Sequence, residues 1–128
     1  MDKTILFTKK AGVNPNNSQG TIKNNILFTS MKAAIDPETG KLVGVGDIRA
    51  QTEKTIQTIL AIVEAGGGTR KDIVKINVFL KDIKDFQAMN EVYRKYFPDE
   101  LPARSLILPA RLFTEDILIE MDAVAILG

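Results

Sequence analysis

The amino-acid sequence predicts a two-layer α+β fold in which two helices pack on one face of a mixed β-sheet. Three observations predict it. Two segments carry apolar residues at helical spacing, six shorter segments are rich in β-branched and aromatic residues, and their order is β-β-β-α-β-α-β-β. The 128 residues fit a single domain spanning 1–128. A chain of this length can bury a core without disulfides or structural metals.

The first part of the sequence predicts three short strands. Residues 3–8 form the first strand, and residues 9–20 are dense in Asn, Gly and Pro, which is typical of a loop. Residues 20–23 and 25–30 are expected to be strands joined by a tight turn at Asn24–Asn25.

The first helix is predicted over residues 48–65. Asp47 precedes this segment and is a suitable N-cap, and Gly66–Gly68 follow it, as glycines do where helices end. The apolar stripe that identifies the helix contains Thr52, Ile56, Ile59 and Val63.

The second half of the sequence predicts a strand over 72–80, a helix over 83–96, and two final strands over 103–109 and 117–127. We expect these last two strands to pair across a hairpin centred near Arg111–Phe113. The strands contain more apolar residues than one helical layer can cover. This excess predicts a further surface that is buried by self-association, most simply in a symmetric oligomer.

The composition excludes several classes of function. The chain has no cysteine and no histidine, so disulfides, thiolate catalysis, cysteine-ligated metals and a Ser-His-Asp triad are excluded. The net charge of +1 argues against a nucleic-acid partner. No apolar run reaches the roughly 20 residues of a membrane span, and the N-terminus lacks the apolar region of a signal peptide. A cytoplasmic location is the simplest expectation.

Arg104 is the first candidate functional residue. It alternates with Leu106 and Leu108 in a predicted strand, so the three side chains are expected on one face. An arginine on an apolar face is costly unless it is paired or binds an anion. Its planar guanidinium suits a carboxylate ligand. A structural ion pair and an arginine that reaches solvent from the strand end remain the alternatives.

Glu120 is the expected companion of Arg104, because the predicted hairpin would place the two residues opposite each other. Glu120 would then either neutralise Arg104 or activate a water molecule beside a ligand. Asn90 lies on the apolar stripe of the second helix, where its amide needs a partner in a neighbouring loop or in a ligand. Ser30 ends an apolar strand and is a weaker candidate for ligand contact.

Two motifs near the C-terminus resemble a known signature. LPARS (Leu101–Ser105) followed by IEMDAVAI (Ile119–Ile126) resembles the signature of the Rid (YjgF) family of imine and enamine deaminases. The segments ILFTS, DPETG, IVEAGG and DIVKINVFLKDIKDFQAMNEVYRKYF resemble other parts of this family in the same order. The resemblance covers nearly the whole chain.

This resemblance implies a chorismate-mutase-like fold that assembles as a homotrimer, with its sites in the clefts between subunits. It implies hydrolysis of reactive 2-imino acids and their 2-aminoacrylate-type enamine tautomers to 2-keto acids and ammonia. The ligand is then a small anionic 2-imino or 2-keto acid, and no cofactor or metal is expected.

The resemblance also implies roles for individual residues. The carboxylate-binding arginine of the family falls on Arg104, the water-positioning glutamate on Glu120, the site serine on Ser30 and the helix asparagine on Asn90. An imine carbon is already electrophilic, so positioning of the carboxylate and the water supplies much of the catalysis.

The pocket residues depart from the family pattern. Asn17 stands where the best-known deaminases have a tyrosine, and Met31 and Lys32 replace Gly-Gln. Leu106 occupies the position two beyond the arginine, which is often cysteine or valine in the family. These departures favour an alternative hypothesis, a non-catalytic homotrimer that binds a small carboxylate metabolite and has a regulatory role. RNA cleavage, which older family labels imply, is disfavoured by the near-neutral charge and the absence of histidine.

Overall fold

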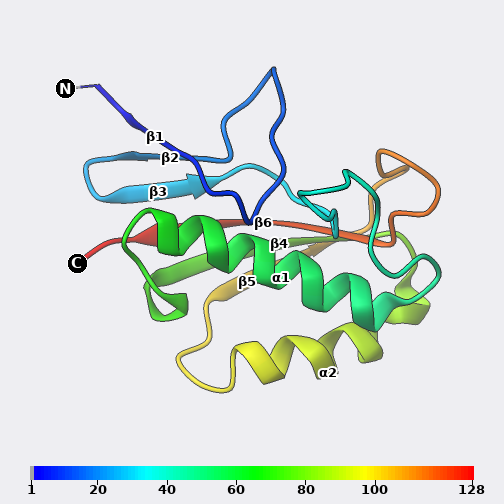
Figure 1. The fold of residues 1–128 in the computed structure, drawn as a ribbon. Helices are drawn as coiled ribbons and strands as arrows, with labels where there is room; N and C mark the ends of the chain where they lie inside the picture. The colour runs from blue at the N-terminus through cyan, green and yellow to red at the C-terminus, as the bar shows by residue number, and fades with distance from the viewer. Residues whose placement is uncertain (1) are drawn as a thin grey trace.

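The computed structural model describes residues 2–128 and has the predicted α+β architecture. A six-stranded mixed sheet forms one layer, and two helices cover one of its faces (Figure 1). The predicted order β-β-β-α-β-α-β-β is confirmed. The elements are β1 Thr4–Leu6, β2 Gly20–Lys23, β3 Ile26–Thr29, α1 Ile48–Ala65, β4 Ile73–Leu80, α2 Phe86–Tyr96, β5 Ala103–Ile107 and β6 Ile119–Ile126.

Helix α1 spans the predicted range. The Asp47 carboxylate accepts a hydrogen bond from the Ala50 N–H at 3.1 Å, which confirms the predicted N-cap. After Gly66, Gly67 has a φ of +91°, in the left-handed region that glycine adopts without strain. Within residues 2–128, neither helix has the length and apolar character needed to cross a membrane.

Helix α2 begins three residues later than predicted. A single 3₁₀ turn, Ile83–Asp85, comes first, and the Asp82 side chain caps it by accepting from the Lys84 N–H at 2.9 Å. The α-helix then runs over Phe86–Tyr96, and Phe97 ends it immediately before Pro98.

The β2–β3 hairpin turns at the predicted Asn24–Asn25 pair. Both residues have positive φ, 51° and 64°, as a two-residue hairpin turn with right-handed strand twist requires. Asparagine tolerates this conformation better than most residues. The strands flanking the turn pair Lys23 with Ile26.

The sheet order is β1-β2-β3-β6-β4-β5, and this order contradicts the predicted pairing of the last two strands. β5 pairs in parallel with β4, and β6 pairs antiparallel with both β3 and β4. β6 has eight residues, most of them buried, and it lies in the interior of the sheet. β5 has five partly exposed residues and occupies the edge. Burial of the more apolar strand therefore overrides the proximity of β5 and β6 in the sequence.

The register assigns Arg104 and Glu120 to opposite faces of the sheet. Arg104 pairs with Ile76, which is buried under the helices, whereas Glu120 pairs with Phe79. Ile76 and Phe79 are three positions apart in β4, and strand side chains alternate between faces. The prediction that Arg104 and Glu120 lie opposite each other within one chain is therefore wrong.

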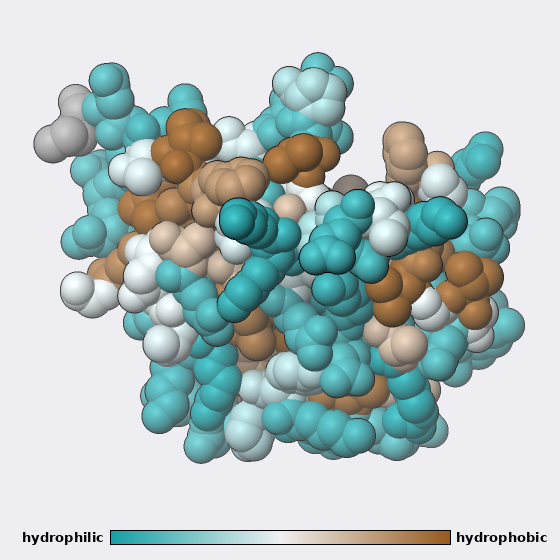
Figure 2. Space-filling view, viewed as in Figure 1, coloured by the Kyte–Doolittle hydropathy of each residue, from teal (hydrophilic) through white to brown (hydrophobic). Residues whose placement is uncertain are grey.

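The face that carries Glu120 is not covered by a helix and exposes apolar side chains. The register aligns Ile26 with Ile126, and Phe28 with Val124, across β3 and β6. Ile26, Phe28 and Ile126 are all exposed, as is Ile5 of β1. Figure 2 shows the opposite, helix-covered side of the molecule, where apolar atoms also gather at the β1–β3 end of the sheet. An exposed apolar face of this kind agrees with the expectation that the sheet is covered by another surface.

Candidate functional site

Helix α2 holds the Arg104 side chain in a fixed position. The Arg104 Nη1 donates a hydrogen bond to Asn90 Oδ1 at 2.8 Å. The guanidinium carbon lies 4.7 Å from the centroid of the Tyr93 ring and 6.0 Å from that of Phe86. None of the ion pairs among residues 2–128 involves Arg104. Its charge is therefore supported by an amide and aromatic faces, without a neutralising carboxylate.

Asn90 thus has a specific structural partner. Its position on α2 places the amide oxygen against Arg104, and the aromatic ring of Tyr93 lies one turn further along the helix. Burial raises the pKa of the Tyr93 hydroxyl, and the charge of Arg104 opposes that shift. Leu106, two residues after Arg104, pairs with Val78 and packs against the core beneath α2.

Glu120 is an incompletely satisfied buried acid. Its residue is 6% exposed, and its Oε2 has no hydrogen-bond partner among the described residues. Burial raises the pKa of the Glu120 carboxyl above its ordinary value. Buried polar atoms are nearly always bonded, so an unpaired carboxylate oxygen beside a cavity is a candidate for contact with water or ligand.

A cavity of about 930 Å³ lies beside Glu120. Three loop regions, the open face of the sheet and Thr58 of α1 border this cavity, which is open to solvent on one side. A cavity of this size accommodates a small metabolite. Of the residues predicted to bind substrate, Asn17, Met31 and Glu120 line it, whereas Ser30, Asn90, Arg104 and Leu106 of the same chain do not. Its wall is formed by Gly12, Val13, Asn14, Asn17, Met31, Lys32, Ala33, Ile35, Gly40, Thr58, Phe79, Pro109, Arg111, Leu112, Phe113, Ile117 and Glu120.

Ser30 and Gln19 shape the loop that forms one wall of the cavity. The Ser30 hydroxyl donates to the Ser18 carbonyl, and the Ser30 N–H donates to the Gln19 carbonyl at 2.9 Å. The buried Gln19 amide donates to three carbonyls, those of Thr8, Ala11 and Gly12. Gln19 was not predicted as a site residue, because a glutamine inside a polar loop gives no periodic signal.

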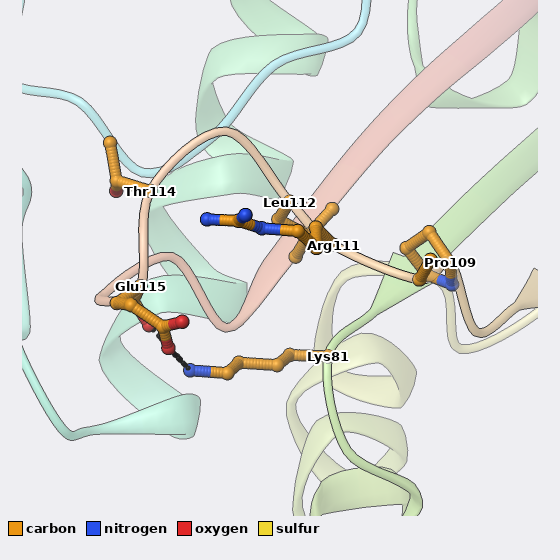
Figure 3. A pocket seen from close by; sticks show the side chains of 7 residues that line it. Lys81, Pro109, Arg111, Leu112, Thr114 and Glu115 are labelled. Carbon is orange, nitrogen blue, oxygen red and sulfur yellow. Dashed lines mark hydrogen bonds and ion pairs between the residues drawn. The ribbon is translucent and has the colours of Figure 1, made fainter.

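The opposite wall is the loop over residues 109–116. Lys81 Nζ binds the Glu115 carboxylate at 2.8 Å and closes the base of this loop, while Arg111 reaches across its inside (Figure 3). The hydrogen bond with Lys81 lowers the pKa of Glu115. The small pocket inside the loop has a volume of about 60 Å³, which suits one or two water molecules and no larger ligand. Gln51 of α1 holds the same end of the loop by donating to the Asp116 carbonyl at 2.9 Å.

Comparisons with known proteins give consistent matches. A family model described as Endoribonuclease L-PSP matches residues 9–127. A RutC family protein of Pyrococcus abyssi is 45% identical over 98% of both chains. A 2-iminobutanoate/2-iminopropanoate deaminase of Escherichia coli is 36% identical, again over 98% of both chains. The crystal structure of Escherichia coli TdcF with bound serine superposes with a TM-score of 0.90 at 32% identity, covering 98% of this chain and 99% of the other.

Proposed function

This chain belongs to the Rid/YjgF/RutC (endoribonuclease L-PSP) family, and from that premise we propose that it hydrolyses 2-imino acids and their enamine tautomers to 2-keto acids and ammonia. Relatives at 36% identity carry the name 2-iminobutanoate/2-iminopropanoate deaminase, whereas closer relatives are described only as RutC family proteins.

The observation that supports the proposal most strongly is that Arg104 is held in place without a carboxylate partner. Its guanidinium is held by Asn90 and stacked on Tyr93, and it has no carboxylate partner among residues 2–128. Such a pre-organised cation is suited to bind the carboxylate of a 2-imino acid through paired hydrogen bonds. Asn90 positions Arg104, and Leu106 fixes the strand by packing against the core.

Glu120 would then direct the water. In the reaction, the water oxygen adds to the C=N carbon while its proton passes to Glu120. The resulting carbinolamine expels ammonia, with proton transfer to nitrogen, and leaves the C=O group of the keto acid. An unpaired, buried carboxylate with a raised pKa suits this exchange of one proton in both directions. We assign Asn17 and Met31 to the walls that contact the rest of the substrate, and Ser30 to the support of the adjacent loop.

A site that uses both Arg104 and Glu120 requires two copies of the chain. In one chain these residues occupy opposite faces of the sheet, as their pairing with Ile76 and Phe79 shows. β5 is an edge strand, so Arg104 lies where a neighbouring subunit can approach. We therefore propose that the site lies in a cleft between subunits, with Arg104 from one subunit and Glu120 from its neighbour. The oligomer would be the homotrimer that the family resemblance implies.

The test is the release of keto acid from 2-imino acids that an amino-acid oxidase generates in the assay. The wild-type protein should accelerate release over spontaneous hydrolysis, and Arg104→Ala should lower kcat/KM by about a hundredfold, as expected for the loss of ~3 kcal/mol of charge-assisted hydrogen bonding. Arg94→Ala is the matched control, because Arg94 is an exposed arginine of α2. A wild-type protein that accelerates no imino acid in a varied panel would contradict the proposal.

A second function is favoured by the altered cavity wall. Asn17, Met31 and Lys32, which depart from the deaminase pattern, all line the cavity beside Glu120. A non-catalytic oligomer that binds a carboxylate metabolite would show saturable keto-acid binding in calorimetry, lost in Arg104→Ala, without acceleration of imine hydrolysis. Ribonuclease activity is not favoured, because the chain has a net charge of +1 and no histidine.

A further inference from the structure

The cavity beside Glu120 contains two cations that the proposed reaction does not use. Lys32 and Arg111 both line it, and Glu120 is the one acidic side chain among the described residues of its wall. Neither cation takes part in an ion pair within residues 2–128. The wall therefore has an excess of positive charge, which attracts an anionic ligand group.

The backbone of Lys32 pairs with that of Met121, the residue that follows Glu120. Its N–H donates to the Met121 carbonyl at 2.8 Å, and the Met121 N–H donates back to the Lys32 carbonyl at 2.9 Å. Its Nζ has one hydrogen bond, a long one of 3.4 Å to the Gly12 carbonyl. Partial burial lowers the pKa of this ammonium group. An ammonium group has three donors, so two of them remain available to a ligand in the cavity.

Arg111 lines the cavity from a loop that is anchored near its C-terminal end. Lys81 binds Glu115 at 2.8 Å, and Gln51 donates to the adjacent Asp116 carbonyl at 2.9 Å. The bond with Lys81 and, to a smaller extent, the nearby charge of Arg111 lower the pKa of Glu115, but Arg111 takes part in no ion pair within residues 2–128. Phe79 and Leu112 provide apolar surface in the same cavity, where the short methylene chain of a ligand can pack.

We propose that Lys32 and Arg111 form a second carboxylate subsite and that the preferred substrates are 2-imino acids with a carboxylate side chain. The inference rests on the proposed function in one respect, namely that Arg104 of the adjoining subunit binds the other carboxylate. In this arrangement a dicarboxylic ligand spans the cleft. Its first carboxylate lies on Arg104, its C=N carbon lies at Glu120, and its second carboxylate lies between Lys32 and Arg111.

The experiment compares two keto acids that differ in the second carboxylate. Calorimetry at physiological ionic strength gives the dissociation constants of 2-oxoglutarate and 2-oxobutyrate for the wild-type protein, Lys32→Gln, and the Lys32→Gln/Arg111→Gln double variant. We expect 2-oxoglutarate to bind the wild-type protein about tenfold more tightly, as a charge-assisted contact provides. The preference should shrink in the single variant and approach unity in the double variant. Lys23→Gln is the control, because Lys23 is exposed and outside the cavity wall.

Three outcomes would overturn the subsite: equal affinity for the two keto acids in the wild-type protein, an unchanged preference in the double variant, or no binding of either compound. This result is separate from that of the proposed function. If monocarboxylic imines are hydrolysed but the preference is absent, only the subsite fails. If no imine is hydrolysed, the deaminase assignment fails, while the ratio of dissociation constants still decides whether the subsite exists.

Discussion

Glu120 is buried in surroundings that suit a catalytic base but lower the stability of the folded protein. Its carboxyl group is 6% exposed, one of its oxygens has no partner, and burial raises its pKa. In the folded protein the neutral form is favoured relative to the unfolded chain, so ionisation at neutral pH opposes folding. The same environment would help Glu120 to accept a proton from water in the proposed reaction, because a carboxylate with a raised pKa is a stronger base.

Glu120→Gln should therefore abolish hydrolysis and stabilise the fold at pH 7. The sign follows from linkage. Below the ordinary pKa of glutamic acid both states are protonated and Glu120 carries no penalty, whereas the penalty grows as pH rises through the raised folded-state pKa. We expect the variant to gain up to roughly 1 kcal/mol at pH 7, because the amide has no ionised form to desolvate, although it too needs hydrogen-bond partners. Denaturant unfolding at pH 7 and pH 4 measures this gain, which should disappear at the lower pH. A destabilised variant at pH 7 would contradict this account.

At the scale of elements, the contact between α2 and β5 fixes the Arg104 side chain. Asn90 on the helix accepts from Arg104 on the edge strand at 2.8 Å, and Tyr93 supports the guanidinium from the next turn. This contact joins two elements that also form the parallel β4–α2–β5 unit. The position of Arg104 thus depends on a helix that contributes no predicted catalytic group.

Asn90→Leu should release Arg104 while keeping a side chain of similar branching at that position. We expect KM for 2-imino acids to rise about tenfold with a smaller change in kcat, because the loss of positioning weakens carboxylate binding in both ground and transition states. Steady-state kinetics measure this split, and Arg94→Leu on the exposed side of the same helix is the control. A fall in kcat at constant KM would instead indicate that Asn90 acts on the reacting atoms.

The sequence predicted the elements more reliably than their pairing. Helix α1 was located to the residue because Asp47 and Gly66 mark its ends chemically, and the β2–β3 hairpin was located because Asn24 and Asn25 adopt positive φ. The position of β6 depends on distant strands, since it inserts between β3 and β4. No local signal encodes that choice, so the pairing of Arg104 with Glu120 was mispredicted.

The residues around the cavity likewise divide into those with a local signal in the sequence and those without one. Arg104 was recognised because a charge in an apolar strand breaks a periodic pattern, Glu120 because the expected hairpin would place it opposite Arg104, and Lys32 because it departs from the family motif. Arg111, Gln19 and Gln51 were not recognised. Two of these lie in irregular segments and the third is a polar residue of a helix. Their roles emerge only from contacts between residues that are far apart in the chain.

For the whole molecule, the opposite orientation of Arg104 and Glu120 makes the oligomer part of the proposed site. The uncovered sheet face exposes Ile26, Phe28 and Ile126, and Arg104 lies on the edge strand. If two subunits contribute to each site, a subunit that lacks Arg104 and a neighbour that lacks Glu120 can still form one intact site between them. A site within one chain has no such property, so mixed oligomers separate the two arrangements.

Arg104→Ala and Glu120→Gln subunits should each be inactive alone and recover activity when they are unfolded together and refolded in equal amounts. Random assembly gives each site a wild-type Arg104 from one subunit and a wild-type Glu120 from the next in about a quarter of cases. Activity per subunit should therefore reach about a quarter of the wild-type value. Refolding of each variant alone is the control for incomplete recovery, and light scattering reports the mass of the oligomer. If the mixed sample stays inactive while it assembles normally, both groups act within one chain and the two-subunit site is refuted. The same would follow from a monomeric wild-type protein that retains full activity, since an isolated chain would then bring Arg104 and Glu120 to one substrate despite their positions on opposite faces of the sheet.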